Sequence, residues 1–178
     1  DPAALGFVPI RSQYLGYLEN GQAASIHCYS AEIDPAVTLT DGLVAEGLRE
    51  LYAPLGDVLF NVAGRAVQVI TWDRTHQYCG QCATLTEALS QERARRCPAC
   101  GLTSYPRISP AAIVAIIRRD EHGERILLAR NHRFAPGRYS VLAGFVEPGE
   151  SLEECAAREV LEETGIRIRD VRCPEAGQ

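Results

Sequence analysis

The stretch GFVEPGESLEECAAREVLEETGI, residues 144–166, determines how the rest of this sequence is interpreted. It carries seven glutamates, and three of them, Glu159, Glu162 and Glu163, have the spacing of neighbours on a helix. Like charges at this spacing destabilise a helix by roughly 0.2–0.5 kcal/mol per pair. Negative charge near the end of a helix is also disfavoured by the helix dipole. The acids therefore need a reason beyond helix formation.

The same stretch otherwise predicts a well-formed helix. Ser151 followed by Glu154 is a capping box, and Gly165 supplies a stop, so we expect a helix over residues 152–164. Apolar residues recur every fourth position and should meet a core: Leu152, Ala156 and Val160.

A hard divalent cation would reverse the repulsion among the three glutamates, because carboxylates are the preferred ligands of Mg²⁺ and Mn²⁺. The alternative is a solvated acidic helix face with no ligand. The spacing of the three acids does not by itself decide between these two interpretations.

The full pattern of the stretch favours the metal. Gly144, Glu150, the run Arg158-Glu159-Val160, the pair Glu162-Glu163 and the pair Gly165-Ile166 follow one another at fixed intervals. This arrangement resembles the Nudix box. The resemblance implies an α/β/α sandwich, and a hydrolase that acts with divalent ions on nucleoside diphosphates linked to another group.

The resemblance also implies roles for individual residues. Glu159, Glu162 and Glu163 would bind Mg²⁺ or Mn²⁺, and the carbonyl of Ala143 would be a further ligand. Glu150 would pair with Arg158 and orient the loop, in a supporting or metal-linked role, and Gly144 would let the backbone approach the ion. Clustered divalent ions would neutralise pyrophosphate oxygens and lower the pKa of a nearby water.

Four of the seven cysteines form two CxxC pairs, with fourteen residues between the pairs: Cys79, Cys82, Cys97 and Cys100. This spacing is typical of a closed tetrahedral zinc site that stabilises a small unit and does no chemistry. Redox-active pairs are the alternative. Cys28, Cys155 and Cys173 have no such partners, so we interpret them as small buried or incidental thiols.

The rest of the chain suggests further elements. Asn20-Gly21 between two strand-like runs predicts a hairpin, and residues 55–73 predict a helix. The run AAIVAII that begins at Ala111 predicts a strand covered on both faces, residues 124–130 a second strand, and residues 137–149 a strand followed by a loop.

The predicted order of domains is similar to that of the NADH pyrophosphatase subfamily. It consists of a small β-rich domain with a linking helix (residues 1–74), a zinc ribbon (75–106) and a Nudix domain (107–178). The segments HQYCGQC, CPACGLTSYPRISP and GRYSVLAGFVEPGES carry that resemblance. It implies hydrolysis of NAD(H) to nicotinamide mononucleotide and AMP, removal of NAD caps from RNA, and a homodimer. It also implies substrate contacts by Tyr105, Glu92 and Phe145; the alternatives are packing between modules, a surface acid and a core position.

The sequence ends thirteen residues after Gly165, without the later strands, metal-binding glutamate and Ser-Gln-Pro-Trp-Pro-Phe segment of the subfamily. We therefore expect an incomplete Nudix domain. Two alternatives to NAD(H) hydrolysis stay open: a Nudix hydrolase of another dinucleotide or an ADP-sugar, and a non-catalytic protein that binds nucleotides, RNA ends or a partner. The net charge of −5 and the absence of a long apolar run predict a cytoplasmic protein that binds neither duplex DNA nor membrane.

Overall fold

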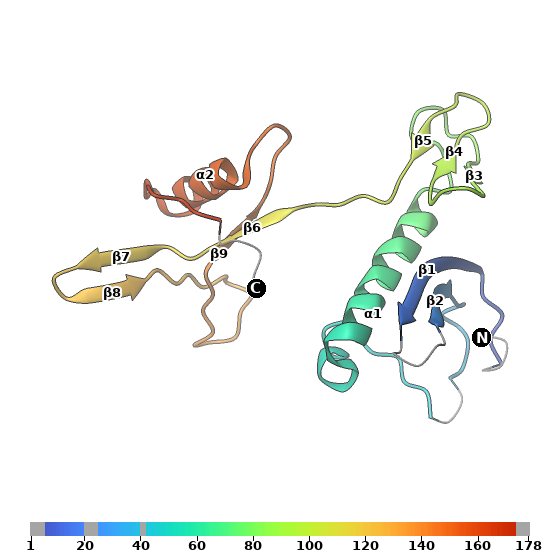
Figure 1. Ribbon diagram of the computed structural model, residues 1–178, viewed down its shortest axis with the longest axis horizontal. Helices are drawn as coiled ribbons and strands as arrows, with labels where there is room; N and C mark the ends of the chain where they lie inside the picture. Colours follow the sequence, from blue (N-terminus) through green and yellow to red (C-terminus); the bar gives the residue numbers. More distant parts are fainter. Residues whose placement is uncertain (1–5, 20–24, 40–41, 174–178) are drawn as a thin grey trace. The chain divides into compact units, whose positions relative to one another are not determined.

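The computed structural model describes residues 6–19, 25–39 and 42–173. It divides the chain into two units, Asp1–Arg107 and Ile108–Gln178, which are described separately here (Figure 1). None of the helices in the described ranges is long and apolar enough to cross a membrane.

A two-stranded hairpin begins the first unit. Strands β1 (Arg11–Glu19) and β2 (Ser25–Glu32) pair antiparallel, as the flanking runs predicted, and the predicted Asn20-Gly21 turn lies outside the described residues. A β-bulge follows Tyr14, where the register shifts by one residue. Leu15 points inward and is buried, while Tyr14 and Tyr17 on either side of it are exposed.

Helix α1 (Tyr52–Thr75) packs along this hairpin (Figure 1). Its backbone breaks once, at Gly56, whose φ of 65° lies in the left-handed region that glycine adopts without strain. The predicted helix over residues 55–73 is therefore confirmed from this break onward. Val69 and Trp72 bury the inner face of its second half.

The segment predicted to be a zinc ribbon, called the ribbon below, follows directly at the end of α1. Its three short strands form one antiparallel sheet in the order β3 (Glu87–Ala88), β4 (Arg95–Arg96) and β5 (Thr103–Ser104). The indole N–H of Trp72 donates a hydrogen bond of 3.4 Å to Ser104 Oγ, which links α1 to β5.

A buried polar network joins the helix to the ribbon and the hairpin. Asp73, only 3% exposed, accepts from Arg95 Nη1 at 2.7 Å and from Gln13 Nε2 at 3.2 Å. Arg95 also donates to the side chain and carbonyl of Thr86 at 2.8 and 2.7 Å. Because burial of an unpaired charge is costly, these bonds hold three segments of the first unit in one arrangement.

In its described part, residues 108–173, the second unit contains two strand pairs and one helix. Strands β6 (Ala111–Val114) and β9 (Leu142–Phe145) pair antiparallel, and β7 (Ile117–Asp120) and β8 (Gly123–Ile126) form a separate hairpin. Helix α2 (Leu152–Thr164) packs on β6 and β9 (Figure 1). Both predicted caps are confirmed: Ser151 and Glu154 form the capping box, and Gly165 is left-handed.

Two packing predictions for this unit are wrong. The run from Ala111 is not covered on both faces: Ile113 is 75% exposed, and the chain leaves strand geometry before Ile117 starts β7. Leu152 is 45% exposed, whereas Ala156 and Val160 are buried as expected. In the described residues, two four-residue strands of about 13 Å meet a helix of about 20 Å, so the strand pair is too short to cover the helix from end to end.

The network around Asp73 gives a stability prediction. Arg95→Met leaves the Asp73 carboxylate buried without its cation, so we expect a loss of about 3 kcal/mol in the free energy of unfolding. The matched control is Arg74→Met. The Arg74 side chain is 60% exposed and its nearest carboxylate oxygen, on Glu32, is 3.9 Å away, so the loss should be about 1 kcal/mol or less.

Urea unfolding followed by the fluorescence of Trp72, the only tryptophan of the chain, measures both variants. Equal losses in Arg95→Met and Arg74→Met would contradict the special position of the Asp73 network.

Candidate metal centres

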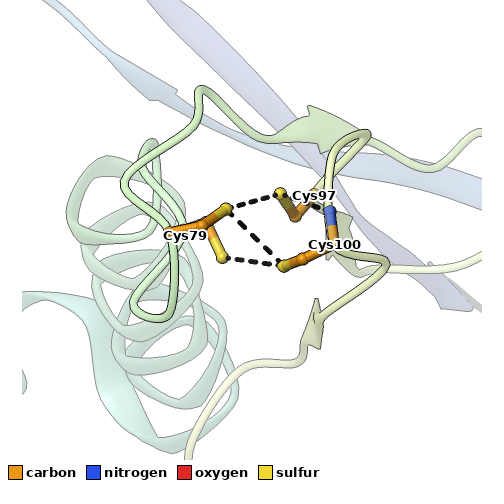
Figure 2. Close-up of side chains that lie close together, drawn as sticks. Cys79, Cys97 and Cys100 are labelled. Carbon is orange, nitrogen blue, oxygen red and sulfur yellow. Dashed lines mark hydrogen bonds between the residues drawn. The ribbon is translucent and has the colours of Figure 1, made fainter.

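The four paired cysteines come together in the first unit. Their sulfur atoms are 3.5 Å apart for Cys79 and Cys100, 3.4 Å for Cys82 and Cys97, and 3.6 Å for Cys82 and Cys100. Figure 2 shows Cys79 facing Cys97 and Cys100 across the cluster. Thiolates placed tetrahedrally 2.3 Å from a zinc ion would be about 3.8 Å apart, whereas a disulfide requires about 2.05 Å. The arrangement therefore fits zinc.

Each CxxC pair forms a turn, called a knuckle here, and the same backbone hydrogen bond closes both knuckles. The amide of the fourth residue after the first cysteine donates to the carbonyl of that cysteine, at 2.9 Å from Ala83 to Cys79 and at 3.0 Å from Gly101 to Cys97. The donor residue is left-handed in both knuckles, with φ of 58° at Ala83 and 78° at Gly101. Glycine adopts this backbone freely and alanine does not, so the first knuckle contains a strained position.

The thiols differ in acidity although they are neighbours. Side-chain and backbone hydrogen bonds with Thr84 lower the pKa of Cys82 to about 6. At Cys100 the backbone hydrogen bond of Leu102 favours the thiolate, but the Cys79 thiol, burial and the other sulfurs outweigh it and raise the pKa to about 12. Four adjacent thiolates need a cation, which zinc supplies as a closed structural site.

The Nudix-box acids lie in the second unit, where Glu159 packs directly against strand β9. A Cβ atom added to Gly144 would lie 1.8 Å from Glu159 Cδ. Glu159 belongs to the same helix face as the buried Ala156 and Val160, so its carboxyl group occupies the space that a side chain at position 144 would fill. The glycine is required because the glutamate points inward.

Arg158 connects most of the box. Its guanidinium donates to Glu150 at 2.5 and 2.8 Å, to Glu159 at 2.9 Å, to Glu162 at 3.2 Å and to the carbonyl of Phe145 at 3.0 Å. The predicted pairing of Glu150 with Arg158 is therefore confirmed. Arg158 also ties helix α2 to the end of β9 and gives Glu159 and Glu162 a shared counter-charge.

The loop before α2 is fixed from both ends. Glu150 N–H donates to the Glu147 carbonyl at 3.1 Å, and Glu147 N–H donates to the Glu150 carboxylate at 3.0 Å. The Arg158 guanidinium, followed by the Glu147 amide, lowers the pKa of Glu150 to about 2. Glu150 is therefore ionised at any pH near neutral and acts as a fixed partner rather than a proton donor.

The described residues contain one group of metal-binding side chains whose ligand atoms all lie within 4.8 Å of one another, and it is the cysteine cluster. Glu159 and Glu162 meet at Arg158, and Glu163 is exposed in the last turn of α2. Ala143 is paired with Ile113 in the β6 and β9 ladder, next to Gly144. The structure thus joins two of the three predicted acidic ligands through a cation of the protein itself.

The three residues predicted to contact the substrate are divided between the two units. In the first unit, Tyr105 Oη donates to Glu92 at 3.3 Å, and the negative charge of Glu92 raises the pKa of Tyr105. In the second unit, Phe145 is 67% exposed and borders an open hollow of about 300 Å³. The other lining residues of the hollow are Ile108, Ser109, Pro110 and Val146.

Some contributions were not expected from the sequence. Cys155 is fully buried as predicted, but it also lies 3.4 Å from the Phe145 carbonyl and 3.7 Å from Arg158, under the site. The Asp73 and Arg95 pair, 22 positions apart, left no local pattern from which it could be inferred.

Three family models match the chain in order. Residues 10–72 match the NADH pyrophosphatase-like rudimentary NUDIX domain, residues 74–105 the NADH pyrophosphatase zinc ribbon domain, and residues 109–175 the NUDIX domain. The chain belongs to the NADH pyrophosphatase branch of the Nudix family. The expected order of a β-rich domain, a zinc ribbon and a Nudix domain is confirmed, and the first domain is itself Nudix-like.

Several curated Nudix relatives bear the name NAD-capped RNA hydrolase NudC. The protein of Pseudomonas syringae pv. syringae is 42% identical over 93% of this chain and 56% of its own length. Those of Stutzerimonas stutzeri and Deinococcus radiodurans are 51% and 48% identical, over 69% and 71% of this chain and 43% and 45% of their own lengths. The chain spans about half the length of these relatives.

The two left-handed knuckle residues give a prediction for the zinc-loaded Nudix protein. Ala83→Gly should stabilise it by roughly 0.5–1 kcal/mol, and Gly101→Ala should destabilise it by a similar amount. A Cβ at position 101 would meet only Arg96, at 3.9 Å, so strain and not crowding causes the loss.

Urea unfolding with zinc content measured in parallel tests both changes. One zinc per chain is expected in each variant. Effects of the same sign in Ala83→Gly and Gly101→Ala would contradict the shared knuckle geometry.

Proposed function

We propose that this protein hydrolyses the pyrophosphate bond of NAD(H) to nicotinamide mononucleotide and AMP, and removes NAD caps from RNA. The observation that carries the proposal is the contact of Glu159 with Gly144. It holds a box carboxylate inward against β9, and Arg158 locks the flanking loop to the same helix. The names of the curated relatives support this substrate class.

The Nudix glutamates are the proposed metal ligands. Glu159, Glu162 and Glu163 would hold Mg²⁺ or Mn²⁺ together with the carbonyl of Ala143, and the ions would supply charge neutralisation and a water of lowered pKa. Arg158 and Glu150 are positioning residues in this proposal. Their ion pair fixes the loop from which the carboxylates approach the pyrophosphate.

Substrate binding is assigned to three aromatic and acidic side chains. Phe145 offers an exposed ring beside an open hollow, which suits stacking on the flat nicotinamide. Tyr105 and Glu92 form one hydrogen-bonded pair and would contact the substrate together. A ribose hydroxyl can donate to the same carboxylate that accepts from Tyr105, so the pair can bind a sugar.

We also propose the three domains with boundaries at residues 74 and 106, and a cytoplasmic homodimer. The hairpin and ribbon share one buried network, which supports the rigid attachment of the zinc ribbon to the first domain. Molar mass measured by light scattering tests the dimer directly.

Removing one proposed ligand tests the catalytic role of the box. Glu163→Gln should lower NADH hydrolysis roughly 100-fold or more, because a lost ligand removes part of the several kcal/mol that metal ions contribute to the transition state. The fold should be retained. Glu153→Gln, an exposed acid in the first turn of the same helix, is the control and should leave the rate unchanged.

Chromatography of the products after incubation with Mg²⁺ or Mn²⁺ provides the measurement. NADH, NAD, ADP-ribose and ADP-glucose are supplied in parallel. Turnover of ADP-ribose or ADP-glucose alone would favour a different Nudix substrate, and metal binding without any turnover would favour a nucleotide-binding protein.

The close approach at Gly144 gives a separate prediction on metal affinity. Gly144→Ala must displace the Glu159 carboxylate, so Mn²⁺ should bind roughly tenfold more weakly. Gly64→Ala on helix α1 is the control, because the nearest atom to its added Cβ is 3.9 Å away. Calorimetric titration with Mn²⁺ measures both, and an unchanged affinity in Gly144→Ala would remove Glu159 from the ligand set.

A further inference from the structure

The second unit carries a strongly basic loop that the proposed chemistry does not use. All 18 basic residues of the chain are arginines, and the chain has 23 acids. Residues 125–146 contain four of these arginines and no aspartate or glutamate. This acid-free stretch ends directly before Glu147, the first glutamate of the box. A protein of negative net charge therefore concentrates positive charge in the chain segment that leads into the residues proposed for pyrophosphate hydrolysis.

The loop, residues 130–139, is built from tight turns. Its ends are joined by the bridge between Ala129 and Ser140, with two hydrogen bonds of 2.8 and 2.9 Å. The Arg138 amide donates to the Ala135 carbonyl at 3.1 Å across Pro136-Gly137, and Gly137 has a φ of 81°. Proline followed by a left-handed glycine is the preference of a type II turn.

The arginines of this loop are free to bind an external anion. Arg130, Arg133 and Arg138 are exposed, and none lies within 4 Å of a carboxylate oxygen in the part of the chain that the structure describes. The Arg138 guanidinium instead lies 5.6 Å from the centre of the Phe134 ring. An aromatic ring orients a guanidinium without neutralising it, so the N–H groups of Arg138 stay available for phosphate.

An aromatic side chain completes the loop. Tyr139 is 58% exposed and directly follows Arg138. Proteins that bind single-stranded nucleic acid use exposed aromatic rings next to arginines, because bases stack on the rings while the guanidinium groups contact the backbone. At most about 18 Å of chain separates Ser140, at the end of the loop, from Phe145 beside the hollow.

We propose that residues 130–139 bind the phosphodiester backbone of single-stranded RNA that continues from the cap, through Arg130, Arg133 and Arg138, with Tyr139 stacking on a base. This inference rests on the proposed removal of NAD caps and adds the site for the RNA chain. The loop would offset the repulsion between the polyanionic RNA and the acidic box, which free NAD(H) experiences much less because it carries only one pyrophosphate.

The test compares two double variants that remove equal charge. Arg133→Gln/Arg138→Gln changes the loop, and Arg118→Gln/Arg119→Gln changes two arginines of the β7 and β8 hairpin that are paired with Asp120 and Glu124. Binding of a fluorescent, unstructured, NAD-capped 12-nucleotide RNA is followed by anisotropy over a series of salt concentrations. Divalent metal is omitted, so that binding is measured without turnover.

We expect the loop variant to bind the RNA roughly tenfold more weakly, with a salt dependence of log K reduced by about 1.4, since each phosphate contact to a single strand contributes about 0.7. The hairpin variant should match the unmodified protein. For the same RNA with a 5′ monophosphate in place of the cap, the loop variant should show the same fold loss of affinity, because the loop contacts the RNA chain and not the cap. NADH hydrolysis should be unchanged in both variants.

Two results would overturn the inference. The first is an RNA affinity and salt dependence that are the same in both double variants. The second is a loss of NADH turnover in the loop variant as large as its loss of RNA affinity, which would place the loop at the dinucleotide. The proposed function fails separately. If no substrate is hydrolysed but RNA binding depends on Arg133 and Arg138, the loop site stands and the catalytic proposal falls.

Discussion

The hydrogen bonds and ion pairs of the Arg158 guanidinium are the interactions on which the second unit depends. One side chain satisfies both oxygens of Glu150, one oxygen each of Glu159 and Glu162, and the carbonyl of Phe145. Without it, the acids of α2 would repel one another at the helix end that least tolerates negative charge. The arginine therefore makes an acid-rich helix compatible with a folded loop.

An ion pair also supports the fold of the first unit, here a buried one in a structure with few apolar contacts. A two-stranded hairpin and a ribbon of two-residue strands have little apolar core of their own. The zinc site closes the ribbon, while Asp73 and Arg95 join it to α1 and the hairpin through a buried, hydrogen-bonded ion pair. The specificity of this junction comes from polar geometry, because an apolar contact alone would allow many alignments.

Charge is segregated along the second unit in a way that the net charge conceals. A stretch of four arginines without acids precedes a box of seven glutamates. The acids of the box suit metal ions and the arginines of the loop suit phosphates, so the segments before and after strand β9 carry opposite charge. The overall charge of −5 disfavours indiscriminate nucleic-acid binding, so any attraction for a polyanion must come from a local concentration of arginines such as this one.

The sequence alone determined the features that depend on short-range spacing. The capping box of α2, its left-handed Gly165, the pairing of Glu150 with Arg158 and the cysteine cluster were all predictable, because each rests on a motif of defined spacing or a family pattern. The tertiary structure alone decided the rest. The inward position of Glu159 against Gly144, the exposure of Ile113 and Leu152, and the ion pair of Asp73 with Arg95 depend on which segments meet in space, and burial and pairing between distant residues leave no periodic trace in the chain.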